Sequence, residues 1–124
     1  MNNTEELIPD FDRMEELATE AARLKSRMLV LKYEIGAYES RCVRDAQIHK
    51  EYWIGGKQPS MAYCDRVVVI LGNSAEDAAW LAAHRNELAE VTEALGLVES
   101  LIVINRDKLD LFRTLSANER KGFL

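Results

Sequence analysis

Apolar residues recur every seven positions in two long segments of the chain. In the first segment they form two neighbouring rows, Met14, Ala21, Met28, Ile35 and Cys42 beside Leu17, Leu24, Leu31 and Tyr38. In the second segment the rows are Leu81, Leu88, Leu95, Ile102 and Leu109 beside His84, Val91, Val98, Asn105 and Phe112. Repeats of this length predict two α-helices that pack side by side as a coiled coil.

The two repeats match one another when the helices run in opposite directions. In an antiparallel pair the position numbers of facing residues have a constant sum, and this holds for Met14 with Leu109 and for Ile35 with Leu88. The charges agree, because the first segment begins acidic and then becomes basic, whereas the second is acidic in its middle and more basic at its end. Exposed ion pairs add little stability, but they help to select an orientation. These patterns predict an all-α fold built on a long antiparallel hairpin.

Asn105 is an amide within the apolar rows and has two interpretations. A buried amide in a coiled coil often fixes the register at a cost in stability. Alternatively, Asn105 lies near a hydrated edge of the helix pair, and the sequence favours neither interpretation.

Capping and turn residues mark the ends of the expected elements. Gly55 and Gly56 end the first helix, and Ser60 is a candidate N-cap for a short helix. Ser74, with Asp77 three residues later, resembles a capping box that opens the third helix. Residues 66–71 of that short helix are rich in β-branched side chains and could instead form a strand, but no second strand is visible to pair with them. The expected elements are a first helix over residues 10–53, a short helix over 60–71, a third helix over 74–115 and a loose tail over 116–124.

The composition predicts one helical domain in the cytoplasm. A chain of 124 residues is sufficient for one domain, and its net charge of −5 disfavours proteins that coat nucleic acid or bind anionic membranes. The two cysteines are too few for a disulfide framework and are typical of free thiols in a reducing compartment. The acidic first residues lack the apolar core of a secretory signal, and no apolar run is long enough to cross a membrane.

The sequence contains no recognisable catalytic or metal-binding spacing. Cys42 and His49 are two helical turns apart, about 10 Å, which is too far for a zinc chelate. The segment Gly55-Gly56-Lys57 lacks the strand and the hydroxyl residue of a phosphate-binding loop. We therefore expect no enzymatic activity, no bound metal and no cofactor.

Apolar residues outside the rows form a second stripe on the third helix. The stripe consists of Leu97, Leu101, Ile104, Leu111 and Leu115, interrupted by Lys108, and Phe11 adds apolar surface at the same end. The short helix is expected at the other end of the hairpin and cannot cover this stripe. Because a large exposed apolar band usually marks an interface, we expect a homodimer that forms a helical bundle. A different protein partner, or the N-terminal segment folded over the stripe, are the alternatives.

The expected hairpin turn gathers aromatic and basic residues. Residues 39–66 carry five bases and four acids, a small positive balance. The candidate contact residues at this tip are Tyr52, Trp53, Lys57, Tyr63 and Arg66. Such residues can pack the short helix onto the hairpin, anchor a protein partner, or stack on nucleobases and contact phosphates. We favour packing, followed by protein contact and then nucleic acid.

The sequence therefore predicts a non-enzymatic protein-interaction module. An adaptor, an assembly subunit or a small acidic inhibitor would fit, acting through the apolar stripe and the aromatic tip. The alternative function is a nucleic-acid-associated helical subunit that uses the basic, aromatic tip.

Overall fold

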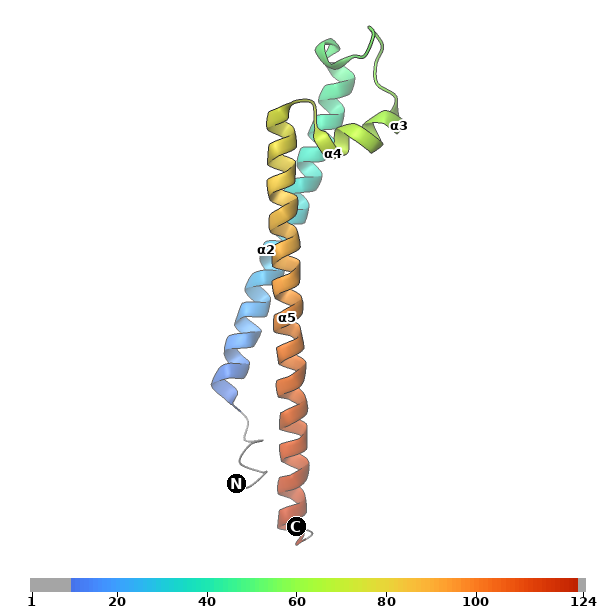
Figure 1. Cartoon of the computed structure of the whole chain (residues 1–124). Helices are drawn as coiled ribbons and strands as arrows, with labels where there is room; N and C mark the ends of the chain where they lie inside the picture. The colour runs from blue at the N-terminus through green and yellow to red at the C-terminus, as the bar shows by residue number, and fades with distance from the viewer. Residues whose placement is uncertain (1–9, 123–124) are drawn as a thin grey trace. The chain divides into compact units, whose positions relative to one another are not determined.

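The computed structural model of the chain describes residues 10–122, and every regular element in that range is helical. Helix α2 spans Phe11–Ile48 and helix α5 spans Ala75–Arg120 (Figure 1). The segment between them contains the 3-10 turn η1 (Lys50–Tyr52), helix α3 (Met61–Tyr63), the π-helical η2 (Cys64–Val68) and helix α4 (Val69–Leu71). The chain is an all-α helical hairpin with a short helix at its turn, as the apolar repeats predict.

The chain divides into two compact units. The terminal unit comprises Met1–Lys25 and Glu93–Leu124, and the turn unit comprises Ser26–Thr92. Each unit contains a part of α2 and a part of α5. The single domain expected from chain length remains a prediction.

The predicted apolar rows face inward within both units. All of their residues are buried or half-buried in the structure. Leu31 and Leu81 are fully buried in the turn unit, while Leu17, Leu24 and Leu95 are the buried leucines of the terminal unit. Full burial of such a side chain contributes about 1.5–3 kcal/mol, so these rows account for much of the cohesion between the helices. The inward faces are thus confirmed, whereas coiled-coil geometry remains a prediction.

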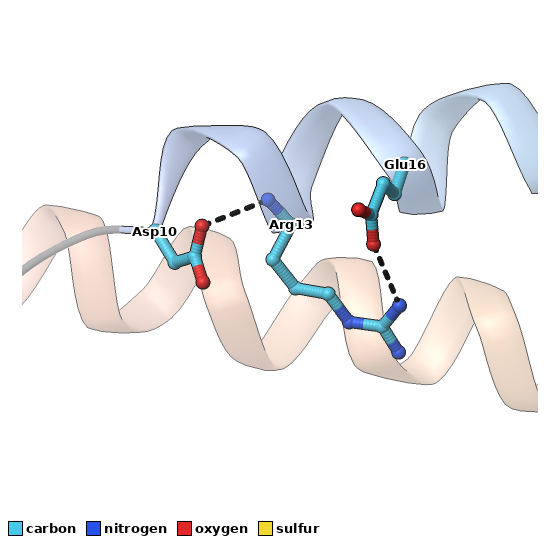
Figure 2. A network of polar contacts seen from close by, with 3 residues as sticks. All are labelled: Asp10, Arg13 and Glu16. Atoms are coloured by element: carbon cyan, nitrogen blue, oxygen red, sulfur yellow. Dashed lines mark hydrogen bonds and ion pairs between the residues drawn. The ribbon is translucent and has the colours of Figure 1, made fainter.

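Helix α2 begins with a short network of charged residues. The Asp10 carboxylate accepts a hydrogen bond of 2.8 Å from the backbone N–H of Arg13 and so caps an otherwise unpaired donor. The Arg13 guanidinium lies 3.3 Å from the Glu16 carboxylate one turn further on (Figure 2). The helix therefore begins at Phe11, one residue after its predicted start at residue 10.

The predicted end of the first helix at residue 53 is wrong, because α2 ends at Ile48. His49 is extended, with φ −91° and ψ 113°, and η1 follows it. The Gln47 carbonyl, which a longer helix would use internally, accepts the indole N–H of Trp53 at 3.2 Å and the side-chain amide of Gln58 at 3.1 Å. These side chains satisfy the helix end, so the backbone can leave the helix before the glycines.

Gly55 and Gly56 form a tight turn beyond η1 instead of ending α2. Their φ angles are +60° and +76°, values that side chains disfavour. Ile54 and Lys57 flank them and exchange two backbone hydrogen bonds of 3.1 Å. Two positive φ angles in a two-residue loop are typical of a type I′ turn.

The segment 60–71 is a helix, as predicted, and not a strand. Its N-cap is Ser60, whose hydroxyl accepts the backbone N–H of Tyr63 at 3.1 Å. A π-helical stretch in the middle places Cys64 and Val68 against Cys42 and Ala46 of α2 in one buried cluster. The strand propensity of this segment is outweighed because the helical conformation lets both Cys64 and Val68 pack against α2.

The third helix is longer than predicted, because α5 continues to Arg120 instead of ending near 115. Residues 116–118 of the expected loose tail are half-buried. The helix ends before Gly122, whose φ is +76° and whose N–H donates to the Glu119 carbonyl at 3.0 Å. A polar composition does not stop a helix when the first glycine lies further along the chain.

Candidate functional site

The predicted apolar stripe is exposed on α5. Leu97, Leu101, Ile104 and Leu111 expose 64%, 39%, 49% and 48% of their surface. Leu115 is half-buried, and Lys108 interrupts the stripe as an exposed residue. All of these residues belong to the terminal unit, together with Phe11, which is 64% exposed. The terminal unit therefore carries the apolar surface that the sequence singles out, although its role as an interface remains a prediction.

Asn105 makes its hydrogen bond within its own helix. Its side-chain amide donates to the Leu101 carbonyl at 2.8 Å, and the residue is half-buried. The side chain also borders a small hollow of about 240 Å³ in the terminal unit, lined by Met14, Leu17, Ala18, Ile102, Asn105 and Arg106. This arrangement agrees better with the hydrated-edge interpretation than with a register lock.

The five predicted tip residues all lie in the turn unit, but they do not form one exposed patch. Trp53 is half-buried, and its indole N–H is engaged by α2. Tyr63 packs against the cysteine cluster, and Tyr52 borders a hollow of about 270 Å³ that also touches Tyr63. Lys57 and Arg66 are exposed, and Arg66 donates to the Ala62 carbonyl at 3.3 Å.

The turn unit contains a polar network that the sequence interpretation missed. The Tyr38 hydroxyl donates to the Asp77 carboxylate at 2.7 Å, and the same carboxylate accepts the backbone N–H of Asn73 at 2.9 Å. The Asn73 side chain donates to the Cys42 carbonyl at 2.8 Å. The Ser74 hydroxyl accepts the N–H of Asp77 at 3.1 Å, which is the predicted cap of α5. The cap signal identified Asp77, but not its bond to α2.

These contacts shift the pKa values of three groups. The hydrogen bond to Asp77 raises the pKa of Tyr38 to about 12. Burial, reinforced by the Asp77 carboxylate, raises the pKa of Cys42 to about 11. Burial would raise the pKa of Asp77, but hydrogen bonds from Tyr38 and the Asn73 backbone outweigh it and hold the pKa below its ordinary value.

Aromatic rings and an arginine reinforce the same unit. Trp80 stacks between Tyr38 and His84, with ring centroids 3.9 Å and 3.6 Å away. The Arg41 guanidinium covers the Tyr38 ring at 4.3 Å. Arg85 donates to the carbonyls of Val69 and Ile70, at the end of the short helix, and lies 3.7 Å from the Glu39 carboxylate.

The two cysteine thiols of the turn unit lie in one buried, packed cluster. The Cys42 and Cys64 thiols are buried, and burial raises both pKa values, which disfavours the nucleophilic thiolate. Within residues 10–122, no three His, Cys, Asp or Glu side chains converge as a metal site. An open hollow of about 590 Å³ borders α2 and η2, lined by Gly36, Glu39, Ser40, Val43, Arg44, Gln47, Ile48, Asp65 and Val69. No pattern in the sequence predicts this hollow.

The comparisons with known proteins give no further assignment. None of the helices described in the structure is both long and apolar enough to span a membrane. The sequence matches no family model, and no significant match was found among curated proteins or solved structures. Functional inference therefore depends on the surfaces described above.

Proposed function

We propose that the chain is a non-enzymatic protein-interaction module that binds through the apolar stripe of α5. The supporting observation is the exposure of Leu97, Leu101, Ile104 and Leu111 along one face of a single helix. Soluble proteins seldom leave such a row uncovered unless it serves an interface. An adaptor, an assembly subunit or a small acidic inhibitor with a net charge of −5 fits this description. A cytoplasmic location, suggested by the free thiols, belongs to the same proposal.

The energy available from the stripe requires several of its residues to be buried together. Full burial of one leucine contributes about 1.5–3 kcal/mol, and these leucines are already partly covered. Association must overcome about 4–15 kcal/mol of lost motional freedom. One or two leucines are therefore insufficient, and a partner has to cover most of the stripe. A helix from a second copy of this chain, or from a different protein, has the required length and shape.

The nucleic-acid alternative has weaker support from the tip. Lys50 lies 5.9 Å from the Trp53 ring centre, and Lys57 and Arg66 are exposed. However, Trp53 and Tyr63 are half-buried and engaged in internal contacts, so they offer little free ring face for stacking. A labelled oligonucleotide at low salt tests this alternative, since binding should weaken with added salt and with Trp53→Ala.

The proposed function is tested by measuring particle size in an extract of the native host and after purification. We expect the tagged wild-type chain to run in a particle heavier than its own 14.1 kDa. The double variant Leu101→Glu and Leu111→Glu should run at the monomer mass with unchanged helical circular dichroism. Leu29→Glu is the matched control, because Leu29 is 57% exposed but lies on α2 in the turn unit. A wild-type chain that is monomeric in both settings would contradict the proposal.

A further inference from the structure

The intervals between successive residues of the apolar stripe are the same whether they are counted from its N-terminal or its C-terminal end. Its positions, Leu97, Leu101, Ile104, Lys108, Leu111 and Leu115, are separated by four, three, four, three and four residues. When a second copy of the stripe is laid on the first in the opposite direction, Leu97 meets Leu115 and Leu101 meets Leu111. A two-fold dimer interface needs a patch that is complementary to itself in this way.

One charged residue in the first half of the stripe, Glu99, also favours the antiparallel register. Residues 93–105 contain the acids Glu93 and Glu99 and no base. Residues 107–119, which face them when the stripes are laid antiparallel, contain the bases Lys108 and Arg113 and the acids Asp107, Asp110 and Glu119. In this antiparallel register Glu99 lies level with Arg113 of the partner subunit and Glu93 with Glu119 of the partner subunit, whereas a parallel pair places each of these charges level with its own copy. Such pairs contribute little energy individually, but they select orientation.

Lys108 also favours the antiparallel arrangement. In a parallel pair the two Lys108 ammonium groups lie at the same level in the middle of the apolar seam, where like charges repel. In the antiparallel pair each Lys108 lies beside Ile104 of the partner subunit, and the two lysines are offset by about 6 Å along the helices. The aliphatic stem of each lysine then covers Ile104 of the partner subunit, and its ammonium group reaches solvent at the edge.

From these observations we propose that the occupant of the stripe is a second copy of this chain, bound antiparallel with its two-fold axis between Ile104 and Lys108. This inference rests on the proposed function and specifies its partner. The contact lies within the terminal unit, where Leu97, Leu101, Ile104 and Leu111 are 39–64% exposed in the single chain. The different-protein alternative becomes an outcome of the test.

Light scattering of the purified full-length chain tests for the second copy. We expect a mass twice the 14.1 kDa of one chain, and the monomer mass for the double variant Leu101→Glu and Leu111→Glu. The control Leu29→Glu should keep the wild-type mass. If the purified chain is monomeric at all concentrations, the second-copy inference is overturned. If the same chain is still in a heavier particle in host extract, and the double variant is not, the proposed function survives that failure.

Cross-linking between introduced cysteines tests the orientation independently of substitutions that remove the contact. Leu97 and Leu115 are about 27 Å apart along one helix, and the native thiols of Cys42 and Cys64 are buried. After mild oxidation with copper–phenanthroline, a mixture of Leu97→Cys and Leu115→Cys chains should give a disulfide-linked dimer on a non-reducing gel. Leu97→Cys alone should give only the wild-type background. A strong dimer band from Leu97→Cys alone would establish a parallel pair and overturn the proposed arrangement.

Discussion

The turn unit and the terminal unit use the same two helices in different ways. In the turn unit, Leu31, Leu81, Cys42 and Cys64 expose 1% of their surface or less. In the terminal unit, the best-buried residues are Leu17, Leu24 and Leu95, at 3–6% exposure, and four stripe residues remain 39–64% exposed. The short helix supplies a third layer to the turn unit through Cys64 and Val68. Over its described residues, 10–25 and 93–122, the terminal unit contains parts of the two long helices and no third layer.

This difference separates the parts of the chain that maintain the fold from those available for binding. The turn unit combines apolar burial with cross-helix polar contacts, such as Tyr38 with Asp77 and Arg27 with Glu87. The ion pairs of Arg13 with Glu16 and of Arg23 with Glu20, by contrast, lie within the first part of α2. A pair of helices cannot cover an apolar arc as wide as that of α5, so the stripe residues of the terminal unit stay exposed.

Truncating a leucine in each unit should separate their roles most clearly. Leu31→Ala removes a fully buried side chain of the turn unit and should lower the free energy of unfolding by about 2–5 kcal/mol. Leu101→Ala removes an exposed one and should lower it by no more than about 0.5 kcal/mol in the monomer. Urea unfolding followed by circular dichroism, at concentrations too low for association, measures both. Equal losses would show that the two leucines are equally buried in solution.

Gly72→Ala should produce the next largest decrease in the free energy of unfolding, and the substitution lies in the turn unit. Gly72 ends the short helix with φ +67° and ψ −156°, a backbone conformation that side chains rarely adopt. A Cβ added there would also clash with the Cβ of Asp77. Together these effects should cost about 2–3 kcal/mol in urea unfolding.

The matched control for Gly72→Ala is Gly96→Ala, in the middle of α5. Apart from the surrounding backbone of its own helix, no atom lies within 4 Å of a Cβ added at Gly96. Alanine also has a higher helix propensity than glycine, so this change should stabilise the chain by about 0.5–1 kcal/mol. If Gly72→Ala were as stable as wild type, the tight passage from the short helix to α5 would be refuted.

The sequence predicts the long-range pairing better than the local ends of the elements. Seven-residue periodicity identifies the inward faces because each row adds up many burial contributions in one direction. Helix ends depend on a few hydrogen bonds, and the bonds from Trp53 and Gln58 to the Gln47 carbonyl join residues whose proximity no periodic pattern reveals. For this reason the end of α2 is predicted five residues late, while the cap at Ser74 is found from its local signature.

The candidate surfaces show the same difference between features that follow from periodic spacing and features that depend on tertiary contacts. The stripe is identifiable from sequence because a helical face follows directly from spacing, and its residues are exposed apart from half-buried Leu115. The network around Asp77 is not identifiable, because it joins Tyr38, Cys42 and Asn73 through tertiary contacts. The tip residues share a segment but face different neighbours, since the π-helical stretch and the Gly55–Gly56 turn redirect the chain between them.

Asp77→Asn should reveal the polar network of the turn unit through the pH dependence of stability. The folded pKa of Asp77 lies below its ordinary value of 3.8. Its ionised form therefore stabilises the fold above about pH 4, and this contribution is lost as the pH falls through the folded pKa. We expect the variant to be less stable than wild type by about 1 kcal/mol at pH 7, and the difference to shrink below pH 4. Asp65→Asn, at an exposed position of η2, is the matched control and should change the stability at pH 7 by less than Asp77→Asn does.

The smallest effect should come from the ion pair that joins α2 to α5 in the turn unit. Arg27 contacts the Glu87 carboxylate with two hydrogen bonds, at 2.7 Å and 2.9 Å, while both side chains remain about 40% exposed. The bidentate hydrogen bond raises the pKa of Arg27 and lowers that of Glu87, so both groups stay charged across neutral pH. Because solvent screens such a pair, Arg27→Met should lower the urea midpoint less than Asp77→Asn does.

The salt dependence of stability distinguishes the charge contribution of this ion pair from packing by the aliphatic part of the Arg27 side chain. In 1 M NaCl the screening length falls to about 3 Å, so the difference between Arg27→Met and wild type should largely disappear. Arg23→Met is the matched control, because Arg23 pairs with Glu20 within α2 alone and does not join the two helices. A loss at Arg27 that persists in high salt would assign its contribution to packing. Charge would then play no part in what distinguishes the turn unit from the terminal unit at this position.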